Sequence, residues 1–186
     1  MLVIISGVSS SGKNTIMNAL VKRMKNLKVL TKSSATTRAP RESDKDNNTY
    51  LFLTQEEFKN AISEGKFFEY ELYSNNYYGT LKDRVEMAVN SKDVDYIRDV
   101  EVKGNVNFRK AYKDKIISIF IDAPNEVLRE RLIKRGDKPE DIERRLSRSE
   151  LERSYKQHYD LVVENIDLEK ALQTIENFLK KNLKNK

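Results

Sequence analysis

The chain begins with an apolar run followed by an amphipathic segment. Residues 2–7 (LVIISG) form a continuous apolar stretch that ends in glycine, which is typical of a central parallel strand. Residues 13–24 place Ile16, Leu20 and Met24 four positions apart, and this spacing predicts an amphipathic helix. The first 25 residues therefore predict a strand, a glycine-containing loop and a helix.

The rest of the chain continues this alternation. Further strands are predicted at residues 28–31, 50–53, 67–73, 94–100, 116–121 and 161–163. Helices are predicted at residues 81–90, 104–112, 125–135, 139–157 and 167–180, and Thr54 with Glu57 forms a capping-box pattern before another. Strands that alternate with helices favour an α/β fold with a mainly parallel core sheet.

One segment, from about Lys32 to Tyr78, breaks this alternation. It is polar and rich in predicted strands, and it contains few helical patterns. We expect it to be an inserted lobe that binds a substrate.

Composition narrows the possible functions. A length of 186 residues suits one domain with a full core. No apolar run approaches the length of a membrane span, so no membrane partner is expected. The absence of cysteine excludes disulfides, thiolate catalysis and zinc–thiolate sites, and it fits a cytoplasmic location. The single histidine, His158, cannot form a histidine metal cluster.

The charge balance is basic, with a formal net charge of +6. Nucleic-acid binding is one interpretation, and a site for polyanionic small molecules is another. Solvated surface is a third, because 35 basic residues are interleaved with 29 acidic ones. Nothing except the net charge supports nucleic-acid binding, so we expect no nucleic-acid partner.

A phosphate-binding loop follows the first strand. Gly7 and Gly12-Lys13 have the spacing of a phosphate loop, in which glycines let backbone N–H groups turn toward phosphate oxygens. The helix that begins near Lys13 points its positive dipole end to the same place. Asn14 stands where Ser or Thr would help to hold magnesium, and Thr15 follows it. The residues expected to contact ATP here are Gly7, Ser9, Ser10, Ser11, Gly12, Lys13, Asn14 and Thr15.

A second cluster points to a phosphate monoester. Arg38 and Arg41 lie three positions apart, with Tyr50 nearby in the sequence. Each guanidinium can form paired hydrogen bonds with a phosphate dianion, and the tyrosine hydroxyl adds a neutral donor.

Several motifs carry a specific resemblance. The stretches SATTRAPR, FFEY and NYYGT resemble the guanylate kinase family, as do APNEVLRERLIKRG and YDLVVENIDLEKAL. The resemblance runs from Leu2 to about Leu179. It implies the three-layer sandwich of a P-loop NTPase, with a parallel core sheet, a strand-rich GMP-binding lobe and a helical lid, all in one domain. The core would comprise residues 1–31, 81–123 and 150–186, the lobe residues 32–80, and the lid residues 124–149.

The resemblance also implies a substrate, GMP. Guanine presents N1–H and N2–H₂ donors beside its O6 acceptor, so a carboxylate at Glu69 and hydroxyls at Ser34 and Thr80 match its edge. Adenine offers a bare acceptor to that carboxylate, which argues against a related kinase acting on AMP. The GMP-binding residues implied are Ser34, Arg38, Arg41, Tyr50, Glu69, Tyr78, Thr80 and Asp99.

On the ATP side, the resemblance implies that Arg135 and Arg145 close over the phosphates and that Asn165 touches adenine. The implied reaction is an ATP:GMP phosphotransfer with Mg²⁺, in which Lys13, Arg38, Arg135 and Arg145 are catalytic. Asn14, Thr15 and Asp99 are candidate metal contacts, in part through water. We expect ATP and GMP as partners, and either a monomer or a homodimer.

One alternative function belongs to a different class. A non-catalytic guanylate-kinase-like binding module would keep the fold and typically lose the phosphate loop. Gly7, Gly12 and Lys13 are all present here, which favours an enzyme.

Overall fold

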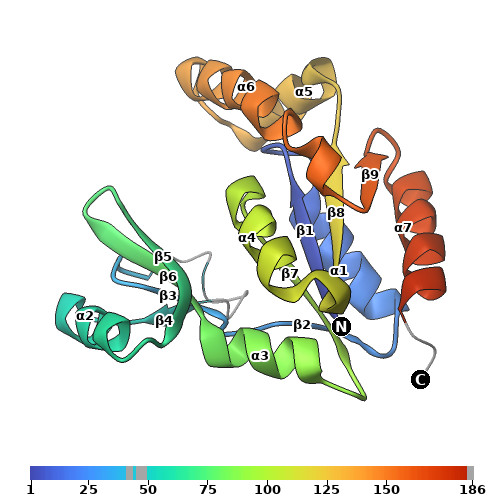
Figure 1. Cartoon of the computed structure of the whole chain (residues 1–186). Coiled ribbons are helices and arrows are strands. Elements are labelled where there is room, and N and C mark those ends of the chain that lie inside the picture. Colours follow the sequence, from blue (N-terminus) through green and yellow to red (C-terminus); the bar gives the residue numbers. More distant parts are fainter. Residues whose placement is uncertain (41–43, 45–49, 184–186) are drawn as a thin grey trace. The chain divides into compact units, whose positions relative to one another are not determined.

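A computed structural model describes residues 1–40, 44 and 50–183. The chain divides into two compact units, which we call the core unit (residues 1–28 and 92–186) and the inserted unit (residues 29–91). Figure 1 shows the elements of both units. Arg41, one of the predicted GMP-phosphate ligands, lies outside the described residues.

The core unit is built on a five-stranded sheet of order β2-β7-β1-β8-β9. The central strand β1 pairs in parallel with both β7 and β8, and β8 pairs in parallel with β9. Every residue of β1 is buried, as its apolar run predicts for a strand covered on both faces. The strands are β1 (Leu2–Gly7), β2 (Leu27–Val29), β7 (Asp95–Asp99), β8 (Ile116–Asp122) and β9 (Leu161–Glu164).

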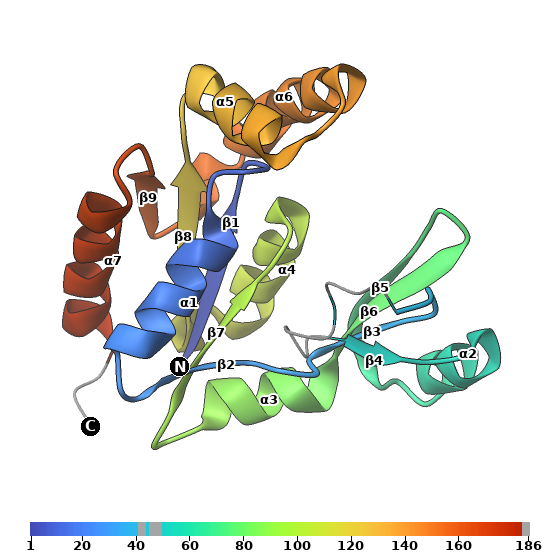
Figure 2. The same cartoon turned by 180° about the vertical axis from the view of Figure 1, so that it is seen from behind.

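Helices cover both faces of this sheet, which gives the three-layer α/β sandwich predicted from the sequence. Figures 1 and 2, which view the molecule from opposite sides, show α1 in front of β1 in one view and α4 in front in the other. Helix α7 packs beside α1. The helices are α1 (Lys13–Arg23), α4 (Val102–Tyr112), α5 (Asn125–Arg135), α6 (Pro139–Arg153) and α7 (Leu168–Asn182). Among the described residues, no helix is long and apolar enough to cross a membrane.

The inserted unit has a four-stranded sheet of order β4-β3-β6-β5. Strand β3 is parallel to β4 and antiparallel to β6, and β5 and β6 form a hairpin. Its core contains Phe58, which is fully buried and stacks on Phe67 and Tyr77 with ring centroids 4.3 and 5.1 Å away. The elements are β3 (Ser34–Thr36), β4 (Tyr50–Phe52), α2 (Gln55–Ser63), β5 (Phe67–Tyr73), β6 (Asn76–Leu81) and α3 (Lys82–Asn90).

Most helices and strands lie where the sequence patterns predict them, and the differences have physical causes. The predicted capping box is confirmed, because the Thr54 hydroxyl accepts the Glu57 N–H and the Glu57 carboxylate accepts the Thr54 N–H. The predicted helix 139–157 is too long, since α6 ends at Arg153 and a short 3₁₀ helix follows at Lys156–His158. Strands β3 and β6 were not predicted. Both contain small or polar residues whose extended form depends on pairing with neighbouring strands.

Candidate active site

The turn from β1 into α1 requires glycine at two positions. Gly7 has φ +146°, and a Cβ atom there would lie 1.9 Å from the carbonyl oxygen of Ile121 on β8. Gly12, the N-cap of α1, has φ +95°, and a Cβ atom there would lie 2.5 Å from the Asn165 amide. Both glycines therefore permit a conformation and a close approach that other residues would strain.

Lys13 reaches back over this loop. Its Nζ donates to the carbonyl oxygens of Gly7 at 2.8 Å and Val8 at 3.1 Å. Burial lowers the pKa of the Lys13 ammonium, and the negative charges of Glu152 and Asp99 oppose that shift. A phosphate bound at the loop would offer this ammonium a charged acceptor, which forms a stronger hydrogen bond than a neutral carbonyl.

Glu152 on α6 also contacts the phosphate loop, although the sequence patterns did not predict it as a site residue. Its buried carboxylate accepts the backbone N–H of Ser9 at 3.3 Å and lies 3.3 Å from Nε of Arg148. Burial raises the pKa of Glu152, while the charges of Lys13 and Arg148 act in the opposite direction. The spacing from Arg145 to Glu152 is two helical turns, which could have indicated a shared face.

Arginines from both α5 and α6 contact the phosphate loop, and one of them shares a carboxylate with a further arginine. Arg145 Nη1 donates to the Ser9 hydroxyl at 3.0 Å, and its Nε lies 3.2 Å from the Asp137 carboxylate. Arg135 binds the same carboxylate through Nε, at 2.7 Å, and through Nη2. Arg131, which was not predicted in the site, donates to the Asn165 carbonyl at 2.7 Å and contacts the loop carbonyls.

Asn165 lies against the loop and is only 3% exposed. Its side-chain amide donates to the Ser11 carbonyl at 2.7 Å, so it holds the loop in shape. Its predicted contact with adenine stays a prediction. Asn14 and Thr15 are exposed in the first turn of α1. Asp99 is exposed at the end of β7, where it pairs in register with Ile5 of β1.

The inserted unit brings predicted GMP ligands into one row. Ser34 on β3 pairs with Tyr50 on β4 and with Thr80 on β6, and Thr80 pairs with Glu69 on β5. Paired residues on neighbouring strands project from the same face of a sheet. The four polar side chains therefore cross the sheet in a line, and Tyr78 follows two positions along β6 on the same face.

Arg38 lies beside the end of this row. Its guanidinium is 5.2 Å from the centroid of the Tyr50 ring, a cation–π distance. Two nitrogens of the guanidinium bind the Asp44 carboxylate at 2.7 and 2.8 Å. This paired geometry is the one that a phosphate would also use.

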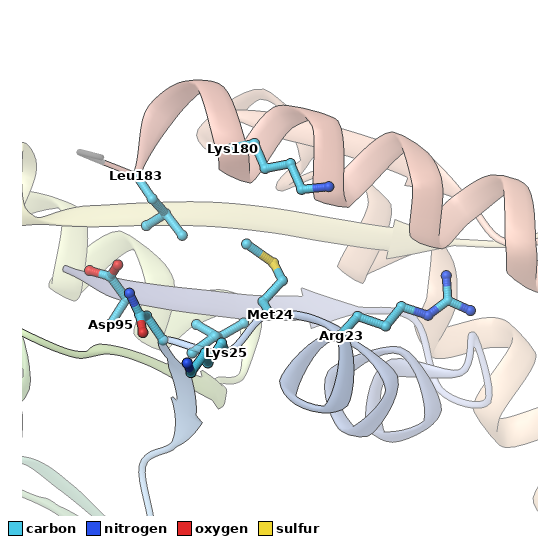
Figure 3. A pocket seen from close by; sticks show the side chains of 8 residues that line it. Arg23, Met24, Lys25, Asp95, Lys180 and Leu183 are labelled. Carbon is cyan, nitrogen blue, oxygen red and sulfur yellow. The ribbon is translucent and has the colours of Figure 1, made fainter. Parts of the chain in front are cut away.

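A pocket of about 300 Å³ lies elsewhere in the core unit (Figure 3). Its lining includes Arg23, Met24, Lys25, Asp95, Lys180 and Leu183. These residues surround the C-terminal end of α1, opposite the end that carries the phosphate loop. The pocket is therefore separate from the loop.

A parallel sheet with a glycine loop between β1 and α1, and a lysine in that loop, defines a P-loop nucleotide-binding protein. Comparison with known proteins is more specific, because the family model for guanylate kinase matches residues 1–182. The chain therefore belongs to the guanylate kinase family, and it is a kinase.

Individual relatives cover nearly the whole chain. A guanylate kinase of Bacteroides thetaiotaomicron is 42% identical over 97% of this chain and 90% of its own length. One from Bacteroides fragilis is 40% identical over 96% of this chain and 89% of its own length. A crystal structure of guanylate kinase from Anaplasma phagocytophilum matches 99% of this chain and 87% of its own chain, with a TM-score of 0.71 and 28% identity.

Proposed function

We propose that this chain transfers the γ-phosphoryl group of MgATP to a phosphate oxygen of GMP, giving ADP and GDP for purine nucleotide metabolism. Family membership supports phosphotransfer to GMP. A cytoplasmic location and a monomeric or homodimeric state stay predictions from the sequence.

The row of polar residues on the inserted sheet carries the substrate assignment. Glu69 can accept two hydrogen bonds from the guanine N1–H and N2–H₂ groups, while the hydroxyls of Ser34 and Thr80 can donate to O6. The pairing of Ser34 and Glu69 with the same residue, Thr80, puts these three groups side by side on adjacent strands. Adenine would leave polar groups of this row unpaired, and such a mismatch strongly reduces binding.

The phosphate loop and the arginines of α5 and α6 would bind ATP, the phosphoryl donor. The loop N–H groups and Lys13 would bind the ATP phosphates, and Arg135 and Arg145 would close over them. Arg38 would hold the phosphate of GMP. Since the acceptor oxygen is already anionic, no strong general base is required, and catalysis comes from alignment and from neutralisation of charge.

The residues near the loop fit a magnesium ion that arrives with ATP. The described residues contain no group of three or more His, Cys, Asp or Glu side chains able to hold a metal. Asn14, Thr15 and Asp99 offer oxygen ligands, which magnesium prefers, directly or through water. Phosphate oxygens would complete the coordination. Bound magnesium would reduce the negative charge on the phosphoryl group that is transferred.

We also propose that the lid (residues 124–149) and the lobe (residues 32–80) close over the two substrates. Closure would exclude water, which could otherwise accept the phosphoryl group.

A steady-state assay of ADP release with MgATP tests this function. GMP, AMP, UMP and dGMP are compared side by side, and we expect GMP to be strongly preferred over AMP and UMP. The Lys13→Met variant should lose turnover, by about 1,000-fold or more, because a thioether can neither donate a hydrogen bond to the β/γ-phosphates nor neutralise their charge. Tight GMP binding by the unmodified chain without phosphoryl transfer would instead identify a non-catalytic binding module.

A further inference from the structure

Asp137 occupies a fixed position at the junction of α5 and α6. Gly136 ends α5 in the left-handed conformation, and its N–H donates to the Ile133 carbonyl at 2.9 Å. The N–H of Asp137 donates to the Leu132 carbonyl at 3.2 Å. This pattern of bonds is a Schellman-type helix end, which fixes the backbone of Asp137 beside the last turn of α5.

The Asp137 carboxylate joins two arginines from different helices. Arg135 on α5 donates Nε and Nη2 to its two oxygens, and Nε of Arg145 on α6 lies 3.2 Å from one of them. The Asp137 side chain is 14% exposed, whereas those of Arg135 and Arg145 are 51% and 39% exposed. The contact with Arg135 holds the pKa of Asp137 below its usual value, so the carboxylate is ionised at neutral pH.

Helix stability alone does not account for this arrangement. Asp137 follows α5, whose C-terminal dipole disfavours an acid, and precedes α6, whose N-terminal dipole favours one, so the two effects oppose each other. The N-cap of α6 is Lys138, and no side chain caps that helix by a hydrogen bond. The carboxylate instead binds the guanidiniums.

Asp137 uses the donors that a phosphate needs. Carboxylates and phosphates bind guanidinium through the same pair of N–H groups, and Asp137 takes the Nε and Nη2 edge of Arg135. We propose that Asp137 is an internal counter-ion that MgATP phosphates displace, and that it thereby sets the affinity of the lid arginines for the nucleotide. This inference rests on the proposed function, which assigns both arginines to ATP.

The exposed pair of Arg129 and Glu143 offers a matched comparison. It also joins α5 to α6 through a two-bond contact between guanidinium and carboxylate. Neither residue is among the predicted ligands of either substrate. Glu143→Gln therefore removes one lid carboxylate, as Asp137→Asn does, but frees an arginine outside the proposed site.

The test measures binding of inorganic tripolyphosphate, by calorimetry, to the full chain and its variants. In Asp137→Asn we expect the dissociation constant to fall about fivefold, because the phosphates no longer compete with a carboxylate. Glu143→Gln should change the dissociation constant by less than about twofold. Unchanged or weaker binding in Asp137→Asn, or equal effects in both variants, would overturn the counter-ion role.

Further measurements distinguish failure of the counter-ion role from misfolding of the variants and from failure of the proposed function. Circular dichroism checks the fold, and Asp137→Ser is a second neutral variant for which the same tightening is expected. In kinetic assays, the KM for MgATP should fall about fivefold in Asp137→Asn, with kcat changed by less than about twofold. If the unmodified chain transfers no phosphoryl group to GMP, the proposed function fails. If it does so but Asp137→Asn binds tripolyphosphate like the unmodified chain, this inference alone fails.

Discussion

The two units hold their polar site residues in different ways. In the core unit, the loop is fixed by side chains from distant segments, such as Asn165 on Ser11 and Glu152 on Ser9. In the inserted unit, the row that contains Ser34 and Glu69 follows from the register of neighbouring strands. The proposed phosphate site therefore depends on long-range side-chain contacts, whereas the proposed guanine-binding row depends on backbone pairing. A mutation that disrupts one of these arrangements should leave ligand binding at the other unit intact.

The largest effect is expected from Phe58→Ala in the inserted unit. Phe58 is fully buried against Phe67 and Tyr77, so its removal should destabilise the unit by about 4 kcal/mol. GMP binding should be lost while tripolyphosphate still binds the core unit. Calorimetry with each ligand checks this prediction, and parallel loss of both would show that the units do not fold independently.

A smaller effect is expected from Gly7→Ala in the core unit. The added methyl group would meet the Ile121 carbonyl at a backbone conformation that alanine disfavours, so we expect a loss of about 3 kcal/mol in unfolding free energy. Gly136→Ala is the control, because Gly136 also has positive φ but no heavy atom lies within 4 Å of its added Cβ. That variant should lose about 1 kcal/mol. Thermal unfolding of both variants gives the comparison, and equal losses would contradict the steric argument.

The smallest change tests the proposed guanine-binding row alone. Glu69→Gln keeps the shape of the side chain but cannot accept both guanine donors, which should weaken GMP binding by about 2 kcal/mol, or roughly 30-fold. Glu71→Gln, two residues along β5 and exposed, removes the same charge as a control. KM values for GMP and MgATP are measured in each variant. An equal effect of both substitutions on GMP would show that Glu69 acts only through general charge.

Sequence patterns anticipated much of the fold for local reasons. The apolar run of β1 and the helical spacing of α1 are properties of short segments, and so is the capping box at Thr54. The Gly7 to Lys13 spacing can be recognised within one short segment, and the structure forms the predicted turn between β1 and α1. The polar strand β3 was missed because its extended form comes from its neighbours.

The sequence by itself determined the alternation of strands and helices, the phosphate loop and the types of side chain available for the proposed contacts with guanine and phosphate. Only the tertiary structure decided that Glu152 accepts the Ser9 N–H and that the Asn165 amide donates to the Ser11 carbonyl. It also decided that Asp137 contacts both Arg135 and Arg145. The reason is physical: hydrophobic periodicity and backbone conformation are local, whereas hydrogen bonds and ion pairs between side chains depend on which helices and strands pack together.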